Sequence, residues 1–262
     1  MEMRPIADTG IRVSVIGLGT VKFGRNQGVK YPQGFDLPDE AALSDLLALA
    51  REEGINLLDT APAYGSSEER LGRLLAGQRQ DWVISTKAGE IFENGRSRFD
   101  FTPAGLTASI EESLRRLRTD YVDILLIHSD GRDMEIIERD GVLDTMARIK
   151  RRGLTRAIGF SGKTVAGALM ALEEVDVVMA TLNPAWREEW PVLEAAAAQG
   201  KAVLIKKAFN SGHAALDGGA EAALRLSLTA PGVASVVCGT ISPAHLSQNA
   251  ALARRICAGS SG

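Results

Sequence analysis

Short apolar runs and amphipathic helical patterns alternate along the whole chain, and this alternation is the strongest constraint on its fold. Eight runs rich in Val, Ile and Leu each precede a segment with helical spacing of apolar residues. Strands that are apolar on both faces are typical of a parallel sheet covered by helices on all sides. Eight such units in about 250 residues fit a (β/α)8 TIM barrel with a parallel eight-stranded core. No linker divides the chain, so we expect a single domain over residues 1–262.

The same spacing sets the expected bounds of the elements. Residues 24–38 exceed the usual length of a connection, which favours a functional loop. Residues 88–101 form a second expected loop. The predicted strands are 13–19, 55–59, 82–87, 121–128, 155–160, 176–182, 202–207 and 233–238, and the predicted helices are 39–54, 67–76, 103–117, 142–152, 164–174, 187–199, 220–229 and 243–256.

An open, doubly wound sheet that binds a dinucleotide at its first turn is the alternative architecture. Gly17 and Gly19 do follow the first predicted strand. The third glycine of the G-x-G-x-x-G pattern would fall at Lys22, so the pattern is incomplete. The closed barrel is therefore favoured over the open sheet.

Composition excludes several classes of partner. Thirty basic and 33 acidic residues give a net charge of -3, which offers no attraction to nucleic acid or an anionic membrane. No apolar run is long enough to span a membrane, and the N-terminus does not read as a secretory signal, so a cytoplasmic location is expected. Cys238 and Cys257 are the only cysteines, and no His or Cys spacing predicts a metal site. We expect a small-molecule substrate and a monomer or weak homo-oligomer.

The segment from 56 to 72 carries the first functional signal. An apolar run ends in Asp59, a proline-containing loop carries Tyr64, and a helix follows. Ser66 lies three residues before Glu69, a spacing that predicts reciprocal capping of this helix. Asp59 and Tyr64 are thus expected where a strand leads into a helix, the edge at which α/β proteins usually carry their chemistry.

Polar residues also end the next two predicted strands. Lys87 ends the third and His128 the fourth. Because the carboxyl ends of barrel strands open on one face, Asp59, Lys87 and His128 should be neighbours, with Tyr64 above Asp59. A buried lysine is costly unless a carboxylate pairs with it, and Asp59 is the expected partner.

Tyr, Lys, Asp and His suit proton transfer to a carbonyl oxygen. An adjacent Lys87 ammonium is expected to lower the pKa of the Tyr64 phenol, and Asp59 to hold Lys87 in place. Tyr64 would then donate a proton while His128 orients the carbonyl by a hydrogen bond. No activated nucleophile is evident, so a hydride from a nicotinamide cofactor is a reasonable complement.

The residues around these positions form a longer pattern. It comprises Asp59-Thr60-Ala61-x-x-Tyr64-Gly65-x-Ser67-Glu68, Lys87, Leu126-Ile127-His128, Gly17-Leu18-Gly19-Thr20, Gly159-Phe160-Ser161, Val237-x-Gly239-Thr240 and Asn249. This pattern closely resembles the aldo-keto reductase family. The resemblance implies NAD(P)H-dependent reduction of aldehydes and ketones to alcohols in a TIM barrel, with Asp59, Tyr64, Lys87 and His128 matching the catalytic tetrad.

The resemblance also implies a cofactor site, from which this chain departs in part. The family has Ser-Asn where this chain has Ser161-Gly162, and a Gln where we align Met179. Two groups that commonly hold the nicotinamide carboxamide are thus absent, while Ser161 remains and Asn183 is expected to substitute. Lys206 stands where an aromatic residue usually stacks on the nicotinamide, and a solvated lysine pair is the alternative reading. The remaining residues expected at the cofactor are Gly19, Thr20, Lys207, Phe209, Gly239, Thr240, His245, Gln248 and Asn249.

The last strand and helix predict the phosphate site. Gly239 and Thr240 lead to Ser242, the expected N-cap, and Pro243, the first helical residue. Helix N-termini near the last strands are the usual phosphate site of a barrel. His245 stands where the family often has an arginine for the adenosine 2′-phosphate. NADPH is therefore the expected cofactor, with NADH as the alternative.

Two other functions stay open. A Schiff-base lyase would use Lys87 as the nucleophile, which requires a neutral amine. A non-enzymatic regulatory barrel would bind the cofactor without turnover, a role known for some members of the family. The expected apolar pocket walls are Tyr31, Phe35, Phe92 and Phe99. The helical spacing of Trp186 and Trp190 predicts packing residues, with a place in the pocket wall as the alternative.

Overall fold

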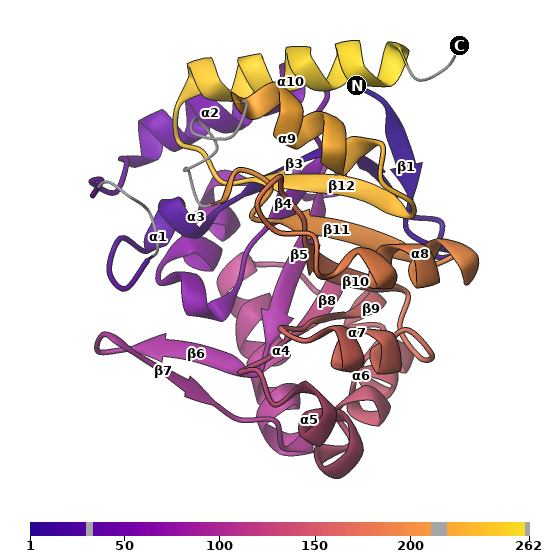
Figure 1. Ribbon diagram of the computed structural model, residues 1–262. Helices are drawn as coiled ribbons and strands as arrows, with labels where there is room; N and C mark the ends of the chain where they lie inside the picture. The colour runs from indigo at the N-terminus through magenta and orange to yellow at the C-terminus, as the bar shows by residue number, and fades with distance from the viewer. Residues whose placement is uncertain (30–33, 211–218, 260–262) are drawn as a thin grey trace.

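The parallel strands close on themselves into a barrel, which confirms the predicted TIM barrel (Figure 1). The computed structural model describes residues 1–29, 34–210 and 219–259. Within these ranges the strand order around the barrel is β10-β11-β12-β3-β4-β5-β8-β9. The barrel strands are β3 (Ile16–Gly19), β4 (Leu57–Asp59), β5 (Val83–Ala88), β8 (Val122–His128), β9 (Thr155–Ser161), β10 (Val177–Thr181), β11 (Ala202–Lys206) and β12 (Val233–Cys238).

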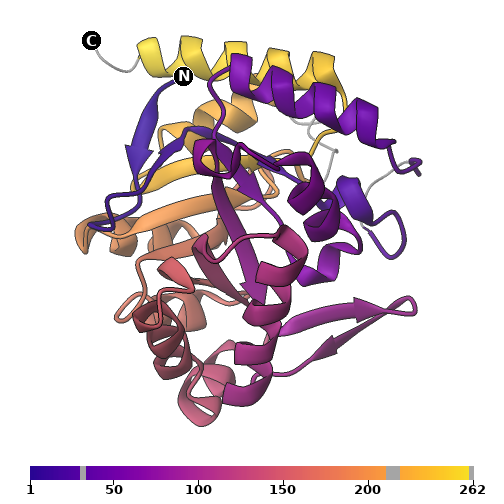
Figure 2. The ribbon, with the colours of Figure 1, turned by 180° about the vertical axis from the view of Figure 1, so that it is seen from behind.

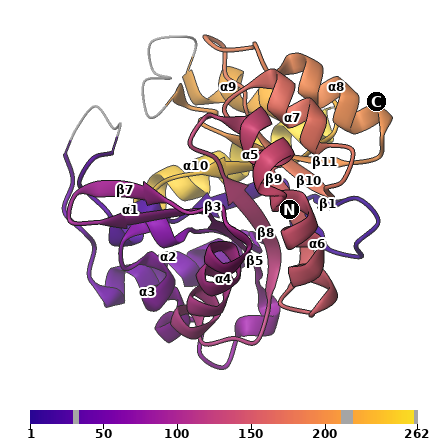
Figure 3. The same cartoon turned by 90° about the horizontal axis from the view of Figure 1, so that it is seen from below.

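Helices surround the outside of the barrel (Figure 3). The expected N-caps are confirmed at Thr102, which accepts from the Gly105 N–H at 3.1 Å, and at Ser242, which accepts from the His245 N–H at 3.4 Å. The helices are α1 (Val21–Gly24), α2 (Glu40–Glu52), α3 (Ser67–Leu74), α4 (Pro103–Leu117), α5 (Asp133–Asp140), α6 (Val142–Arg151), α7 (Val165–Ala171), α8 (Trp190–Ala198), α9 (Gly219–Leu228) and α10 (Pro243–Ala258), with short 3-10 turns η1 (Pro62–Tyr64) and η2 (Arg79–Asp81).

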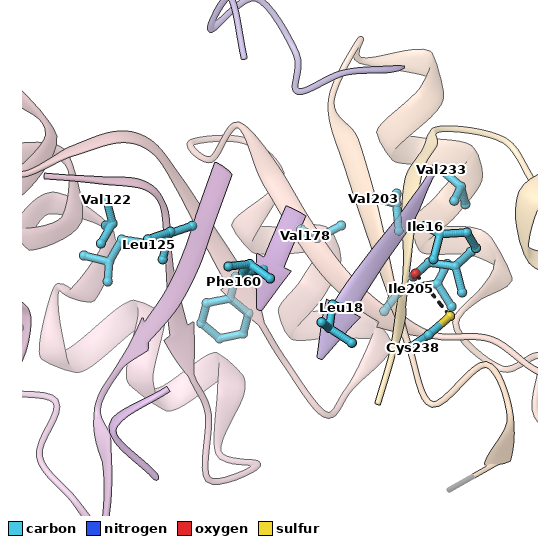
Figure 4. Close-up of a cluster of buried hydrophobic side chains, with 14 of the residues drawn as sticks. Ile16, Leu18, Val122, Leu125, Phe160, Val178, Val203, Ile205, Val233 and Cys238 are labelled. Atoms are coloured by element: carbon cyan, nitrogen blue, oxygen red, sulfur yellow. Dashed lines mark hydrogen bonds between the residues drawn. The ribbon is translucent and has the colours of Figure 1, made fainter. Parts of the chain in front are cut away.

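Side chains alternate between two cores along the strands. Leu57, Val83 and Ile124 belong to an inner cluster within the barrel, whereas the neighbouring residue on each strand belongs to an outer cluster. Successive side chains of a strand point to opposite faces, so a strand that is apolar throughout supplies both cores. The outer cluster fills the space between strands and helices, and Figure 4 shows part of it, including Ile16, Leu18, Leu125, Phe160, Val178, Val203 and Ile205.

A β-hairpin that the sequence analysis did not predict covers the amino-terminal end of the barrel. Strands β1 (Met3–Pro5) and β2 (Arg12–Ser14) pair antiparallel. Ile6, Ile11 and Val13 of this hairpin are fully or almost fully buried in the inner cluster. The hairpin therefore closes the barrel interior at the end opposite to the strand carboxyl ends.

The predicted strand 13–19 is wrong as one continuous strand. Val15 is the point of change, because its N–H donates to the Glu2 carbonyl of the hairpin while its carbonyl accepts from Val236 of the barrel. Arg4 fastens the hairpin by donating to the carbonyls of Leu228 at 3.0 Å and Val233 at 2.8 Å. These bonds connect the beginning of the chain with its last strand and helix pair, near which the N-terminus lies (Figure 2).

Three further expectations are corrected. The predicted loop 88–101 contains a hairpin of β6 (Glu90–Glu93) and β7 (Arg96–Phe99), which projects from the barrel in Figures 1 and 2. Helix α5 was not predicted. The capping by Ser66 is wrong, because its side chain caps nothing, and Ser67 instead bonds its hydroxyl to those of two neighbouring threonines.

The predicted loop 24–38 is only partly described, and Tyr31, an expected pocket wall, lies outside the described residues. No helix in the described ranges combines the length and apolar character that crossing a membrane requires.

Candidate active site

A buried ion pair lies at the carboxyl ends of β4 and β5. The Lys87 ammonium is 2.8 Å from each carboxylate oxygen of Asp59 and 2.9 Å from the Thr60 carbonyl oxygen. The two residues are only 1% and 3% exposed. Burial alone would lower the pKa of Lys87, but the Asp59 carboxylate and Tyr64 together outweigh it, and the pKa stands above its ordinary value. The predicted pairing of Lys87 with Asp59 is confirmed, and the amine is charged.

Tyr64 lies against this pair at the end of η1. The next residue, Gly65, has a φ of +60°, and a Cβ there would collide with the carbonyl of Gly24, so only glycine allows this turn. The Lys87 ammonium is 4.8 Å from the centre of the Tyr64 ring. Burial nevertheless raises the pKa of Tyr64 by more than Lys87 lowers it. The expected lowering of this pKa is therefore wrong, and the phenol holds its proton at neutral pH.

His128 completes the group from the last position of β8. Its ring meets that of Tyr64 edge to face, with centroids 6.4 Å apart and an interplanar angle of 89°. Burial lowers the pKa of His128, and the nearby Lys87 adds to this, while Glu90 opposes it. The structure thus brings Asp59, Tyr64, Lys87 and His128 together at one end of the barrel.

Glu90 is the neighbour that sequence reasoning missed. Its Oε2 lies 2.8 Å from His128 Nδ1, although the contact lacks the alignment of a regular hydrogen bond. Glu90 belongs to β6, and the Asn94-Gly95 pair between β6 and β7 is a strong hairpin signal that could have revealed this strand.

The described aromatic residues that were expected to line the pocket each contact a different neighbour. The Arg25 guanidinium lies 3.4 Å from the centre of the Phe92 ring in the hairpin. Phe99 stacks on Phe101 with centroids 6.0 Å apart, and the Lys22 ammonium lies 5.0 Å from the centre of the Phe35 ring. Each of these aromatic rings therefore has a described neighbour of its own.

A cavity of about 300 Å³ opens beside the carboxyl ends of β10 and β11. Lys206 lies in its wall and donates to Ser161 Oγ at 3.1 Å and to the Gly162 carbonyl at 2.7 Å. Burial lowers the pKa of Lys206 to about 8, while the neighbouring Glu189 opposes this shift. The Lys206 amine is therefore held inside the site, not solvated as the alternative reading had it.

Asn183 shapes the rim of this cavity. Its Nδ2 donates to the Lys207 carbonyl and its Oδ1 accepts from the Ala185 N–H, each at 3.1 Å. Trp186, which bridges to Asn183 through the backbone, is 44% exposed and lines the cavity, so the expectation that it packs in the core is wrong. Trp190 packs against the outer cluster, as predicted.

The expected phosphate residues lie at the start of α10 and beside it. Thr240 accepts from the Ser242 N–H at 3.0 Å and so fixes the approach to the helix. His245 and Gln248 are exposed, whereas Asn249 is buried. In the first turn of α10, Pro243 has no N–H and the His245 N–H donates to Ser242 Oγ, so the backbone N–H groups there are largely occupied.

The remaining expected cofactor residues differ in accessibility. Gly19 at the end of β3 faces β12, where a Cβ would lie 3.0 Å from a Val237 methyl group and 3.5 Å from Gly239 Cα. Thr20 is fully buried and donates to the Asp59 carbonyl at 3.0 Å, so it supports the ion pair. Phe209 packs against the outer cluster.

A model of the aldo/keto reductase family matches residues 15–218. The chain belongs to the aldo/keto reductase family.

Named relatives agree with this assignment. L-galactose dehydrogenase of Arabidopsis thaliana is 35% identical over 174 residues, which cover 62% of this chain and 49% of the relative. Aldo-keto reductase YhdN of Bacillus subtilis is 34% identical over 169 residues, which cover 63% and 48%. The chain thus spans about half the length of the curated relatives it matches. A candidate aldo-keto reductase from Pseudomonas aeruginosa, solved by crystallography, is 50% identical with a TM-score of 0.89 and covers 97% of this chain and 95% of its own.

The residues of this aldo/keto reductase fit a nicotinamide dinucleotide. The cavity beside β11 holds the Lys206 amine, which attracts phosphate or ribose oxygens when protonated. Gly19 ends β3 and Gly239 follows β12, and a Cβ at Gly19 would lie 3.0 Å from a Val237 methyl group, so glycine keeps the backbone close there, next to the N-terminus of α10. Among the described residues no three His, Cys, Asp or Glu side chains gather as a metal site.

Proposed function

We propose that this aldo/keto reductase reduces aldehydes and ketones to alcohols with NADPH, or with NADH as the alternative cofactor. The observation that carries the proposal is the buried Asp59–Lys87 pair, which holds an ammonium 4.8 Å from the centre of the Tyr64 ring. A phenol beside a fixed cation can give up its proton to a carbonyl oxygen that gains negative charge.

The proton in this reaction comes from Tyr64. Because the pKa of Tyr64 is raised, the phenol is protonated before the reaction, as a general acid must be. The Lys87 ammonium stabilises the phenolate that remains, and Asp59 keeps that ammonium charged and in place. His128 orients the carbonyl oxygen. When bound, the dinucleotide supplies the hydride that the carbonyl carbon accepts.

Cofactor binding is proposed for the rim between β9 and β12. Ser161, Lys206 and Asn183 would hold the nicotinamide end, and Lys206 or Lys207 would reach the phosphates. The glycine-lined ends of β3 and β12 would let the backbone approach the pyrophosphate, with Thr240 and the start of α10 beside it. Gln248, Asn249 and His245 would lie at the adenosine.

Two other functions compete with the reductase for the same site. A Schiff-base lyase needs a neutral Lys87, whereas Asp59 keeps this amine charged. A regulatory barrel that binds the cofactor without turnover shares the cofactor residues, and only a turnover assay separates it from a reductase.

The test follows the oxidation of NADPH and NADH by absorbance with a reactive aldehyde. We expect turnover by the wild type and none by Tyr64→Phe, which should still bind the cofactor. Tyr121→Phe is a matched control, because Tyr121 precedes β8 at the amino-terminal end of the barrel, where its ring lies 4.6 Å from the Arg79 guanidinium. If the wild type oxidises neither cofactor, the proposal is wrong.

The substrate panel should include sugars. The name of the Arabidopsis relative, L-galactose dehydrogenase, points to sugar oxidation. The same residues serve the reverse reaction, in which a hydroxyl group is oxidised and Tyr64, as the phenolate that Lys87 stabilises, takes up the hydroxyl proton. Oxidation of L-galactose with NAD or NADP, followed by the same absorbance assay, tests this direction.

A further inference from the structure

The hairpin β6–β7 places a carboxylate behind His128. Gly89, between β5 and β6, has a φ of +106°, and a Cβ there would lie 2.5 Å from the Phe101 ring. Only glycine permits this turn, which directs the chain from the barrel strand into the hairpin. The first residue after the turn is Glu90, whose Oε2 lies 2.8 Å from His128 Nδ1.

Glu90 is held in this position by the hairpin itself. Ser97, on the partner strand β7, donates to Glu90 Oε1 at 2.5 Å. Burial would raise the pKa of Glu90, but His128, then Ser97 and the positive charge of Arg25, lower it to about 2. Glu90 is therefore a carboxylate over the whole working range of pH.

The two nitrogens of His128 face different surroundings. Nδ1 is buried, and Glu90 Oε2 lies 2.8 Å from it. The side chain is 21% exposed, so the open part of the ring is the edge away from Nδ1, which carries Nε2. A carboxylate close to one ring nitrogen favours the proton on that nitrogen, and the other is then bare in the neutral ring.

We propose that Glu90 is a positioning residue that acts through His128. Its carboxylate holds a proton on Nδ1, so that Nε2 accepts a hydrogen bond from a substrate hydroxyl when the ring is neutral and donates one to a substrate carbonyl when the ring is charged. This inference rests on the proposed reductase function. It adds that the protonation of His128 selects between the carbonyl and the alcohol as the better bound substrate.

The charges around His128 set the pH at which this change occurs. Burial lowers the pKa of His128, Glu90 raises it, and the Lys87 and Lys206 ammonium groups lower it. The Tyr64 phenol, which faces the ring edge to face, is neutral at these pH values. Removing the negative charge of Glu90 should therefore lower the pKa of His128.

Nitrogen-15 NMR of the histidine rings tests the inference without any need for turnover. The chain has three histidines, so the His128 signals can be assigned by their loss in His128→Asn. In the wild type we expect the neutral ring to carry its proton on Nδ1. In Glu90→Gln the pKa of His128 should fall by about one unit, since an adjacent opposite charge is worth at least that much.

Two further variants test whether the shift in the His128 pKa is specific to Glu90. Glu93→Gln removes an equal charge from an exposed position on the same strand and should leave the His128 titration unchanged. Ser97→Ala keeps the charge of Glu90 but frees its side chain, and should give a smaller shift in the same direction if Glu90→Gln does not fold. A neutral wild-type ring with its proton on Nε2, or an unchanged titration in both Glu90→Gln and Ser97→Ala, overturns the inference.

Kinetics then separate this inference from the proposed function. For carbonyl reduction, kcat/KM should fall as the pH rises through the pKa of His128 measured by NMR, and in Glu90→Gln this fall should occur at lower pH by the same interval. A titration that shifts while the pH profile does not move overturns the positioning role. A wild type that reduces no carbonyl overturns the proposed function, whatever the NMR titration shows.

Discussion

The Asp59–Lys87 pair predicts a large and specific stability effect. Both side chains are almost completely buried, and Lys87 Nζ makes three contacts of 2.8, 2.8 and 2.9 Å. Removing one member leaves the other as an unpaired buried charge, which costs about 3–5 kcal/mol. Asp59→Leu and Lys87→Met should each lower the free energy of unfolding by this amount at pH 7.

The double variant is the decisive comparison. Replacing a buried pair by apolar side chains of similar volume is often neutral, because the cost of dehydrating both charges disappears with their attraction. Asp59→Leu combined with Lys87→Met should therefore regain most of the stability that either single change loses. Urea unfolding followed by circular dichroism measures all three variants on one scale.

An exposed ion pair supplies the control. Arg152 and Glu111 lie 2.8 Å apart, but their side chains are 51% and 52% exposed. Arg152→Ala should cost at most about 1 kcal/mol, because water screens such pairs. If Asp59→Leu lowers the free energy of unfolding by no more than Arg152→Ala does, the buried Asp59–Lys87 pair contributes no more to stability than an exposed pair, and the reasoning is wrong.

The pH dependence of the pair has a definite sign. The pKa of Lys87 is raised above its ordinary value of 10.5. A lysine with a raised pKa stabilises the fold below its unfolded pKa, and this stabilisation is lost as the pH rises through the folded value. The stability difference between wild type and Lys87→Met should therefore narrow above pH 10.5.

Other regions of the chain give three further predictions. The affinity for NADPH, measured by cofactor fluorescence, should fall as the pH rises through about 8, where the Lys206 amine loses its charge. Lys206→Met should bind NADPH weakly, and its affinity should not fall over this pH range. Gly72→Ala should lower the thermal unfolding temperature, because the new methyl group would collide with the Arg116 carbonyl of α4. This loss runs against the usual effect of replacing glycine by alanine in a helix, which stabilises the fold by up to about 1 kcal/mol. Asp123→Asn should cost about 1.5–3 kcal/mol in urea unfolding, because the buried Asp123 carboxylate accepts from the Arg79 guanidinium at 2.8 Å; an unchanged midpoint would contradict this.

The barrel and its four central side chains could be predicted because both depend on periodic features of the sequence. Strands that are apolar on both faces require helices on both sides, and the carboxyl ends of parallel strands must share one face. Asp59, Lys87 and His128 each lie at or next to such an end, so their meeting follows from the topology alone. The pairing of Lys87 with Asp59 then follows from the cost of burying a charge.

What the sequence did not reveal depends on contacts between distant segments. The strands of the hairpin β1–β2 are short, and packing over the barrel interior stabilises their pairing rather than a local sequence pattern. The pKa of Tyr64 depends on how completely η1 is buried, which no local pattern contains. Lys206 bonds to Ser161 across 45 positions of sequence, so its place inside the site was equally hidden. Glu90 is the exception, because Asn94-Gly95 is a local hairpin signal.

The closure of the barrel between β12 and β3 has a consequence for how the chain folds. The bonds from Arg4 to Leu228 and Val233 span 224 and 229 positions, so they cannot form until residues 228 and 233 have been synthesised. Contacts of such high sequence separation slow folding, because a long loop must be closed before they are made. Until β12 is in place, the edges of β3 and β11 have no partner, and each can pair with a strand of another chain. A chain that has not yet closed the barrel with β12 is therefore prone to aggregate.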